Sequence, residues 1–261
     1  MTLQEILDAS GTEKVDRELL AGFVLGQSRS WVLAHGTDAL TENDCKNLRA
    51  VLERRKNCEP LALLTGTKEF FGREFIVSKD TLIPRPATEK IVEKVLQFLR
   101  NDEVKTEEID SGISAYVCRF SDTPIETVLD IGTGCGCIAI TLALEGVTQS
   151  MIAIDTSQAA LAIAMKNAKK LGAHNVQLTK GDGVNVVRNF HRPFLLVSNP
   201  PYIPEGTKLE KTVQDFEPHS ALFAGPDGLN VITPLLIAAR GNKNCVGVIV
   251  EMRTEQIIHL P

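Results

Sequence analysis

An apolar run that stops at two consecutive prolines constrains the fold of this chain more than any other stretch of its sequence. The run is Phe194-Leu195-Leu196-Val197, and Ser198-Asn199-Pro200-Pro201-Tyr202 follows it directly. A short apolar run of this kind is typical of a strand buried in a parallel sheet, and proline ends it because proline donates no ladder hydrogen bond. Asn199 is therefore predicted at the carboxyl end of a strand, where open α/β sheets bind ligands. The alternative is a structural Pro-Pro turn capped by the asparagine.

The composition indicates an ordinary globular protein with a weakly acidic balance of charge. The 261 residues are 43% hydrophobic and 23% charged, which is enough for one large core and a smaller second domain. A net charge of −5 argues against a broad phosphate-binding surface, so stable nucleic-acid binding is not expected. No apolar run reaches the roughly 18 to 20 residues that span a bilayer, so no membrane association is expected.

The six cysteines indicate a reducing compartment. They form no Cys-x-x-Cys pair and have no histidine at ligand spacing, so no metal site is predicted. Scattered thiols of this kind are typical of reduced, mostly buried cysteines. The expected location is the cytoplasm, or the mitochondrial matrix if the source is eukaryotic.

Residues 1–66 are predicted to form a helical bundle. Thr2 followed by Glu5 has the spacing of a capping box, and apolar residues recur at helical spacing, with Trp31 and Leu33 as core candidates. Such a bundle ahead of an α/β domain is either a structural cap or the part that selects a partner. A β-hairpin over residues 67–80 is expected to link it to the rest of the chain.

Residues 81–261 alternate strands and helices in the way that predicts a Rossmann-like parallel sheet. Residues 101–122 are acidic, polar and aperiodic, so they are predicted to form an exposed inserted loop. The last predicted strand is Val246–Val250, which gives the sheet five strands. An apolar sheet edge is therefore expected to be exposed after that strand.

A glycine-rich turn follows the predicted strand Thr127–Ile131. Its sequence is Gly132-Thr133-Gly134-Cys135-Gly136, and glycines at this spacing let the backbone turn tightly and approach a ligand at the positive end of the next helix. A second strand ends in Asp155, which suits a carboxylate that binds ribose hydroxyls, and a third ends near Asp182-Gly183. These residues are predicted to hold a cofactor.

Two classes of ligand fit such a turn, and Asp130 distinguishes them. A dinucleotide fingerprint needs a small residue where this chain has Cys137 after Gly132 and Gly134. Asp130, just before the turn, would repel a pyrophosphate but attract an ammonium group. A ligand that carries an amino-acid ammonium, a ribose and a base but no phosphate is S-adenosylmethionine. The alternative role for Asp130 is that of a helix-capping acid.

Several motifs together make the sequence resemble the HemK/PrmC family. They are Asp130 to Gly136, Asp155, Asn199-Pro200-Pro201-Tyr202, the loop Ile83-Pro84-Arg85-Pro86-x-Thr88-Glu89, and the segments Phe216 to Leu222 and Gly225 to Leu229. The resemblance extends from the helical bundle to about Gln256. Three features depart from it: Ala87 stands where the family usually has Asp, Arg253 where Gly is usual, and the chain stops at Pro261 while the family's sheet continues through two more strands.

The resemblance implies an S-adenosylmethionine-dependent methyltransferase that modifies the glutamine N5 in the Gly-Gly-Gln loop of class 1 peptide chain release factors. It implies that Asn199, Pro200, Pro201 and Tyr202 orient and enclose the glutamine amide, and that Asp130, Gly132, Thr133, Gly134, Cys135, Gly136, Asp155, Asp182, Gly183 and Asn199 hold the cofactor. Two alternatives stay open. One is a nucleic-acid adenine or guanine N-methyltransferase, because Asn-Pro-Pro-Tyr also occurs in such enzymes, and the other is a non-catalytic protein that binds a release factor.

Overall fold

The first helix, α1 (Leu3–Ala9), begins at the capping box that the sequence predicts. In the computed structural model, which describes residues 1–260, the Thr2 hydroxyl accepts a hydrogen bond from the Glu5 N–H, and the Glu5 carboxylate accepts one from the Thr2 N–H. The box stabilises the helix because the first turn otherwise leaves its N–H groups without partners.

Six helices form the smaller of two units, which comprises Met1–Thr67 and Leu209–Phe216. They are α1, α2 (Lys14–Leu25), α3 (Arg29–Ala34), α4 (Glu42–Lys56), α5 (Leu61–Thr65) and α10 (Lys211–Gln214). Buried aliphatic side chains from the first helices make its core, and Trp31 packs against them. Leu33 is 58% exposed, so the prediction that it belongs to the core is wrong. The neighbouring Val32 is buried instead, because one position along a helix changes the face.

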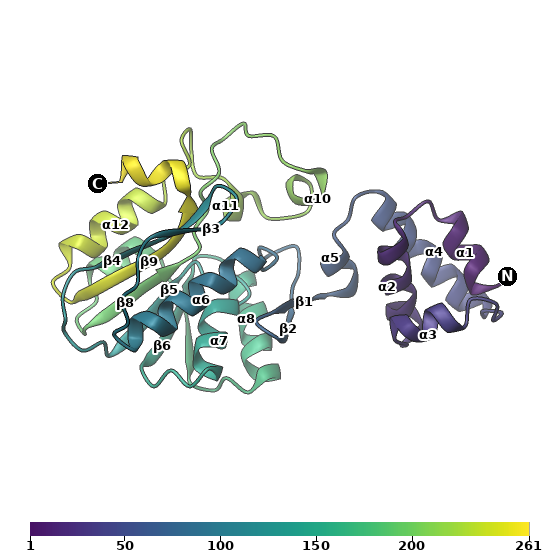
Figure 1. Cartoon of the computed structure of the whole chain (residues 1–261), viewed down its shortest axis with the longest axis horizontal. Coiled ribbons are helices and arrows are strands. Elements are labelled where there is room, and N and C mark those ends of the chain that lie inside the picture. Colours follow the sequence, from purple (N-terminus) through teal and green to yellow (C-terminus); the bar gives the residue numbers. More distant parts are fainter. Residues whose placement is uncertain (261) are drawn as a thin grey trace. The chain divides into compact units, whose positions relative to one another are not determined.

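The larger unit, Lys68–Lys208 with Glu217–Pro261, is built on a seven-stranded sheet in the order β3-β4-β9-β8-β5-β6-β7 (Figure 1). The strands are β3 (Glu107–Asp110), β4 (Ile113–Arg119), β5 (Thr127–Ile131), β6 (Ser150–Asp155), β7 (Val176–Lys180), β8 (Phe194–Ser198) and β9 (Cys245–Arg253). The five strands from β9 to β7 are parallel, whereas β3 and β4 are antiparallel to their neighbours. A separate two-stranded sheet joins β1 (Thr67–Phe70) to β2 (Arg73–Ile76).

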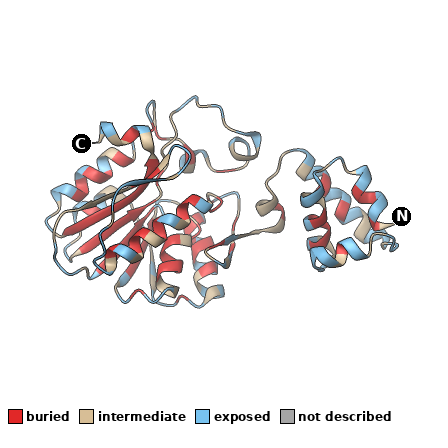
Figure 2. Ribbon diagram, viewed as in Figure 1, coloured by how far each residue is buried: buried red, intermediate tan, exposed pale blue. Residues whose placement is uncertain are grey.

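Helices cover both faces of the large sheet. Val128 and Leu195 pack with α6 (Pro86–Leu99) and α7 (Cys137–Leu144) in one apolar cluster, and their neighbours Leu129 and Leu196 pack with α12 (Ile232–Gly241) in another. This division follows from the strands, whose successive side chains point to opposite faces. The central strands are buried (Figure 2).

Besides α6, α7 and α12, the larger unit contains further helices. They are α8 (Gln158–Leu171), α9 (Gly183–Arg188), α11 (His219–Leu222) and the 3-10 helix η1 (Thr254–His259). Within residues 1–260, no helix combines the length and the hydrophobicity that crossing a membrane requires.

Residues 101–122 do not form the exposed loop that the sequence predicts. They contain β3 and β4, and β4 pairs with β9 along its whole length, from Ile113 opposite Arg253 to Arg119 opposite Gly247. The sheet therefore has seven strands rather than five, and β4 covers the edge of β9 that the sequence leads one to expect exposed. The polar side chains of this stretch give no sequence signal for strands, although its backbone forms a hairpin that pairs with β9.

The parallel strands bring the functional segments to one edge of the sheet. β5 pairs in register with both β6 and β8, so that Ile131 lies opposite Ile154 and Ser198. The residues that follow these strands, which include the glycine turn, Asp155 and Asn199, are therefore neighbours in space.

Candidate active site

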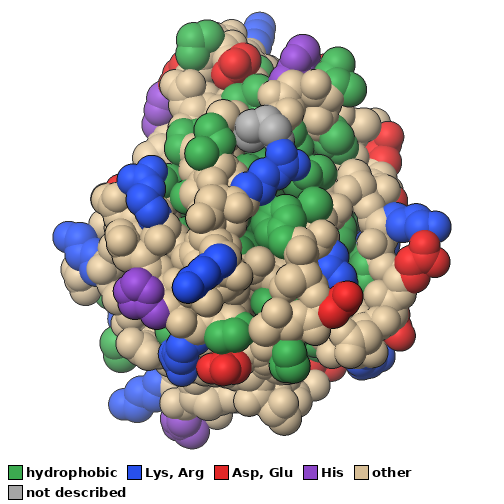
Figure 3. Space-filling model, turned by 90° about the vertical axis from the view of Figure 1, so that its left-hand side faces the viewer, with side chains coloured by type: hydrophobic (Ala, Val, Ile, Leu, Met, Phe, Trp, Pro, Cys, Tyr) green, Lys and Arg blue, Asp and Glu red, His purple; other side chains and the backbone are tan. Residues whose placement is uncertain are grey.

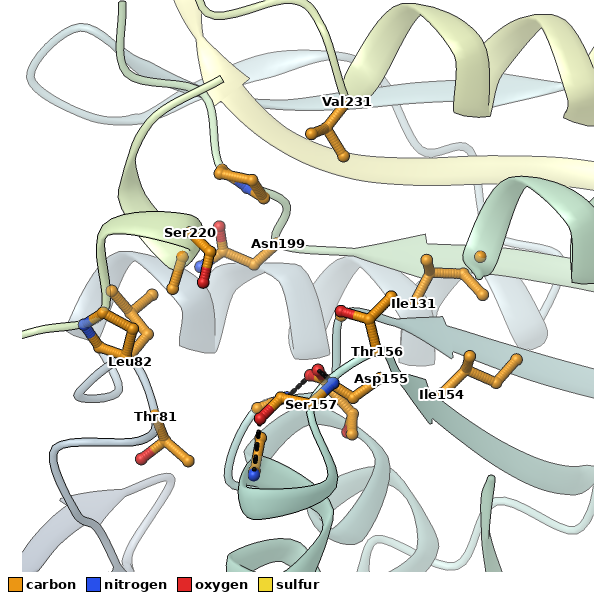
Figure 4. Close-up of a pocket in the computed structure, with 18 of the residues that line it drawn as sticks. Thr81, Leu82, Ile131, Ile154, Asp155, Thr156, Ser157, Asn199, Ser220 and Val231 are labelled. Atoms are coloured by element: carbon orange, nitrogen blue, oxygen red, sulfur yellow. Dashed lines mark hydrogen bonds between the residues drawn. The ribbon is translucent and has the colours of Figure 1, made fainter. Parts of the chain in front are cut away.

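A cavity of about 560 Å³ opens at the carboxyl ends of β5, β6 and β8. Figure 4 shows Asp155–Ser157 on one side of it, while Asn199 and Ser220 lie together at another end, near Leu82. The cavity thus joins the segments that the sequence assigns to the cofactor with those that it assigns to the acceptor.

Most of the predicted site residues line this cavity. Those in the lining are Gly132, Thr133, Gly134, Cys135, Asp155, Asp182, Gly183, Asn199 and Pro201. Four others, Asp130, Gly136, Pro200 and Tyr202, lie outside the lining. Gly136 has a packing role, because a Cβ atom there would lie 2.7 Å from the Cδ1 of Ile140.

The glycine turn is held to β6 by its own N–H groups. The N–H groups of Gly132 and Thr133 both donate to the Ile154 carbonyl, at 2.8 and 3.0 Å, and the Gly134 N–H donates to Asp155 Oδ2 at 2.9 Å. Gly132 and Gly134 have φ values of +74° and +57°, which favour glycine. A pyrophosphate site needs free N–H groups, and those of this turn are mostly occupied, so the geometry disfavours a dinucleotide.

Asp130 is buried beneath this turn, with only 1% of its surface exposed. Its Oδ2 accepts hydrogen bonds from the Thr133 hydroxyl at 2.6 Å and the Ala139 N–H at 3.2 Å, so it ties the turn to the start of α7. Burial is the main cause that raises the pKa of Asp130 to about 6, and these hydrogen bonds oppose the shift. The other oxygen, Oδ1, is buried without a partner in residues 1–260. Asp130 thus fulfils the capping alternative and keeps one free acceptor.

Asp155 ends β6 with its carboxylate fixed against the backbone. Its Oδ2 accepts from the Gly134 N–H at 2.9 Å and its Oδ1 accepts from the Ser157 N–H at 2.8 Å. An ionised carboxylate has roughly four acceptor positions, so about two remain for other donors. A vicinal pair of ribose hydroxyls matches this remaining capacity.

The Asp182-Gly183 corner comes very close to β5. Asp182 caps α9 by accepting from the Val184 N–H at 3.0 Å. A Cβ atom on Gly183 would lie 2.3 Å from the Cγ2 of Ile131, so no larger residue fits there without a shift. This corner lines the cavity together with Ile131, Ile154 and Asp155.

These residues fit S-adenosylmethionine. The apolar side chains of Ile131 and Ile154 suit the flat base, and the remaining acceptor positions of Asp155 suit the ribose. Asp130 is buried beneath the turn, so it suits the ammonium group through its negative charge and not through direct contact. When bound, this cofactor supplies an electrophilic methyl group on a sulfonium.

Asn199 follows β8 and presents one free acceptor. Its Nδ2 donates to the Thr88 hydroxyl at 3.0 Å, while its Oδ1 is buried without a partner in the part of the chain that the structure describes. Pro201, two residues later, also lines the cavity, so the Pro-Pro loop forms part of the wall.

Tyr202 does not line the cavity, and its predicted role as a wall of the site stays a prediction. Its hydroxyl donates to Glu251 Oε1 at 3.0 Å, and the second oxygen of Glu251 accepts from the Thr88 hydroxyl at 2.8 Å. Sequence reasoning did not assign Glu251 or Thr88 to the site. The available signal was a carboxylate inside the otherwise apolar run Cys245–Met252, since a buried charge is rarely without partners.

A buried carboxylate fastens the Ile83–Arg85 loop beside the cavity. Glu217 accepts from the Ile83 N–H at 2.9 Å and forms an ion pair with Arg85. Leu82 and Pro84 of this loop line the cavity, as does Pro218 after Glu217. The Arg-Pro loop is therefore part of the cavity wall and more than a linker.

The fold and the site define a Rossmann-like methyltransferase, and comparison with known families agrees. Residues 98–230 match the methyltransferase small domain family, and residues 2–66 match the PrmC N-terminal domain family.

Curated relatives named release factor glutamine methyltransferase are similar over most of the chain. That of Buchnera aphidicola is 37% identical, covering 87% of this chain and 74% of the relative. Those of Koribacter versatilis and Escherichia coli K12 are both 35% identical, cover 90% of this chain, and are themselves covered over 80% and 76% of their lengths. This chain belongs to the release factor glutamine methyltransferase family.

Proposed function

We propose that the chain uses S-adenosylmethionine to methylate N5 of the glutamine in the Gly-Gly-Gln motif of class 1 peptide chain release factors. The observation that carries the proposal is Asn199 Oδ1, a buried acceptor without a partner in residues 1–260, in the cavity that also contains Asp155. A glutamine side chain offers an N–H donor for this oxygen. Three relatives are named release factor glutamine methyltransferase, which supports the class of substrate and reaction.

When bound, S-adenosylmethionine would supply the methyl group and retain on its sulfur the electron pair of the broken bond, while the amide nitrogen that gains the methyl group would release a proton to water. An amide nitrogen is a poor nucleophile because its lone pair is delocalised into the carbonyl. The protein must therefore orient it. Asn199 Oδ1 and the Pro200 carbonyl are proposed to accept the two amide hydrogens and so to aim the nitrogen at the methyl group.

The cofactor is proposed to lie over the glycine turn. Asp155 binds the ribose, the buried charge of Asp130 attracts the ammonium from beneath the turn, and the Asp182-Gly183 corner borders the base. The helical bundle of residues 1–66 is proposed to recognise the release factor, with residues 67–80 as the link to the catalytic residues 81–261. The match of residues 2–66 to a domain family found with this enzyme supports that division.

A protein substrate is preferred to a nucleic acid because of the charge. The chain carries a net charge of −5. On the face of the molecule in Figure 3, basic, acidic and hydrophobic side chains are interspersed. A phosphate backbone would favour a continuous basic surface.

One labelling experiment tests the proposal. The chain is incubated with S-adenosylmethionine carrying a labelled methyl group, together with a release factor, bulk RNA or DNA, and the labelled residue is located by mass spectrometry. The expected result is label on the Gly-Gly-Gln glutamine, and none on a release factor in which this glutamine is replaced by alanine. Label on RNA or DNA would show the nucleic-acid alternative, and release-factor binding without label would show the non-catalytic one.

A further inference from the structure

We infer that Glu251 is a positioning residue for methyl transfer, because it fixes the direction of the hydrogen-bond chain that runs from Asn199 through Thr88. It thereby makes Asn199 present its oxygen, and not its NH2 group, to the acceptor amide. The inference rests on the proposed function and adds a residue that touches neither the cofactor nor the acceptor.

The chain joins three elements distant in sequence. Glu251 lies on β9 and is 1% exposed, and Thr88 lies in the first turn of α6 and is 2% exposed. Glu251 Oε2 is 2.8 Å from the Thr88 hydroxyl, and that hydroxyl is 3.0 Å from Asn199 Nδ2. Thr88 and Asn199 both line the cavity, whereas Glu251 stands behind them.

The direction of the chain follows from the number of protons. An ionised carboxylate only accepts, so the single hydroxyl proton of Thr88 is directed to Glu251. The Thr88 oxygen is then left with acceptor capacity alone, and the atom of Asn199 that faces it must be the NH2 group. Asn199 Oδ1 is therefore turned away from Thr88 and is the atom without a partner in residues 1–260.

Without this carboxylate, the hydrogen bond to Thr88 favours neither of the two orientations of the Asn199 amide. The two ends of a primary amide have nearly the same shape, and a hydroxyl that is free to rotate bonds equally well to either. A flipped Asn199 would offer donors to an acceptor amide whose own N–H groups need an acceptor. The misdirected fraction of the enzyme would not orient the nucleophile.

Burial opposes the charge of Glu251, whereas its neighbours favour that charge. Burial raises the pKa of Glu251 above its ordinary value, while the neighbouring polar side chains of Thr88, Tyr202 and Asn199 and the charge of Arg85 lower it. Burying a carboxylate is costly unless it is well hydrogen-bonded, so an apolar residue would be the simpler choice at this position of β9. The retained carboxylate and its partners are the features that the positioning role requires.

Glu251→Gln and Thr88→Val test the chain in the full-length protein. Glutamine keeps the shape of Glu251 but can present either an oxygen or an NH2 group to Thr88, and valine removes the hydroxyl. Each should lower kcat for the release factor by roughly 10 to 100-fold, the order of loss from a slightly misplaced reactant. The affinity for S-adenosylmethionine, measured by calorimetry, should change less than about twofold. The double variant should be no slower than the slower single variant, because both changes interrupt one chain.

Two further comparisons separate positioning from mere structural support. Thr88→Ser, which keeps the hydroxyl, should recover most of the rate that Thr88→Val loses. The side-chain amide signal of Asn199 in a nitrogen-15 NMR spectrum should shift in both Glu251→Gln and Thr88→Val. It should stay in place in Glu18→Gln, which neutralises a carboxylate that is also buried but lies in the helical unit.

The outcomes that overturn the inference are distinct. They are an unchanged rate or an unchanged Asn199 signal in Glu251→Gln, losses that multiply in the double variant, or a fall in cofactor affinity as large as the fall in kcat. The NMR comparison needs no substrate. If the unaltered chain transfers no methyl group to the release factor and the Asn199 signal still shifts, the proposed function fails and the direction of the chain stands.

Discussion

Asn199 combines a donor already in use with an acceptor that has no partner in residues 1–260, and we expect its replacement to separate catalysis from cofactor binding. Asn199→Ala removes the acceptor but no backbone group, so the fold should persist. Turnover with a release factor should fall on the order of 10² to 10³-fold, as for the loss of one preorganised polar contact at a reacting centre. Calorimetry should show S-adenosylmethionine affinity almost unchanged. An equal loss in both measurements would make Asn199 a cofactor ligand, and full activity would make it a strand-end cap.

Replacement of Asp155 should weaken cofactor binding and not the orientation of the acceptor. Asp155→Asn replaces one acceptor oxygen by an NH2 group, which must then face either the Gly134 or the Ser157 N–H, each a donor itself. Charge-assisted hydrogen bonds contribute roughly 1.5 to 3 kcal/mol, so cofactor affinity should weaken about tenfold or more. Calorimetry measures this directly, with thermal unfolding as the check that the variant folds. Unchanged affinity would remove Asp155 from the cofactor site.

At the scale of elements, the strands that are apolar on both faces are those that the sequence predicts most directly. β5, β6, β8 and β9 are such strands, and the sequence predicts each of them. β3 was not predicted, because Glu107, Glu108 and Asp110 are exposed and an edge strand has one side in solvent. A strand is predicted from the periodicity of its apolar residues, so a strand made mostly of polar residues is missed.

The residues of the site divide in the same way, into those that a local sequence pattern predicts and those that only the tertiary structure brings together. Asn199, Asp155 and the glycine turn are predictable because each stands next to a strand end in the sequence. Glu251 and Thr88 are 163 positions apart, and only the pairing of β9 with β8 and the packing of α6 bring them together. No local pattern contains that contact.

The pairing of β4 with β9 should make a measurable contribution to stability. Ala115→Pro removes a backbone donor from β4, a strand that is paired on both sides, and should lower the free energy of unfolding by about 1 to 3 kcal/mol and promote association through the loosened edge. The control is Glu103→Pro, in the exposed segment before β3. Denaturant unfolding and size-exclusion chromatography measure the two effects. Coincident unfolding curves for the two variants would show that the hairpin contributes little.

At the scale of the whole molecule, the buried Asp130 makes the stability depend on pH. Its pKa is raised to about 6 in the folded chain, so between about pH 4 and pH 6 the folded state binds more protons than the unfolded state. Stability from this group is therefore present at low pH and is lost as the pH rises through 6. A shift of about two units corresponds to a change on the order of 3 kcal/mol.

The comparison that isolates this effect is with Asp130→Asn, which does not titrate. Denaturant unfolding of both proteins at several pH values between about 4.5 and 7.5 should show the unaltered chain losing stability relative to the variant as pH rises. A difference between the two that is independent of pH would mean that the folded state does not raise the pKa of Asp130.

The place of β9 in the sheet has a consequence for the order of folding. Its neighbours β4 and β8 both precede it in the chain, so β9 enters a gap between two existing strands instead of extending an edge. Ser114 and Thr254, which hydrogen-bond at one end of this junction, are 140 positions apart, and contacts of such separation form slowly. Until β9 enters, β4 can pair only with β3 and β8 only with β5, and Thr88 lacks the carboxylate of Glu251. In a chain emerging from the ribosome, the carboxylate that we infer to orient Asn199 therefore arrives with the last strand of the sheet, and we expect methyl transfer to require the closed sheet.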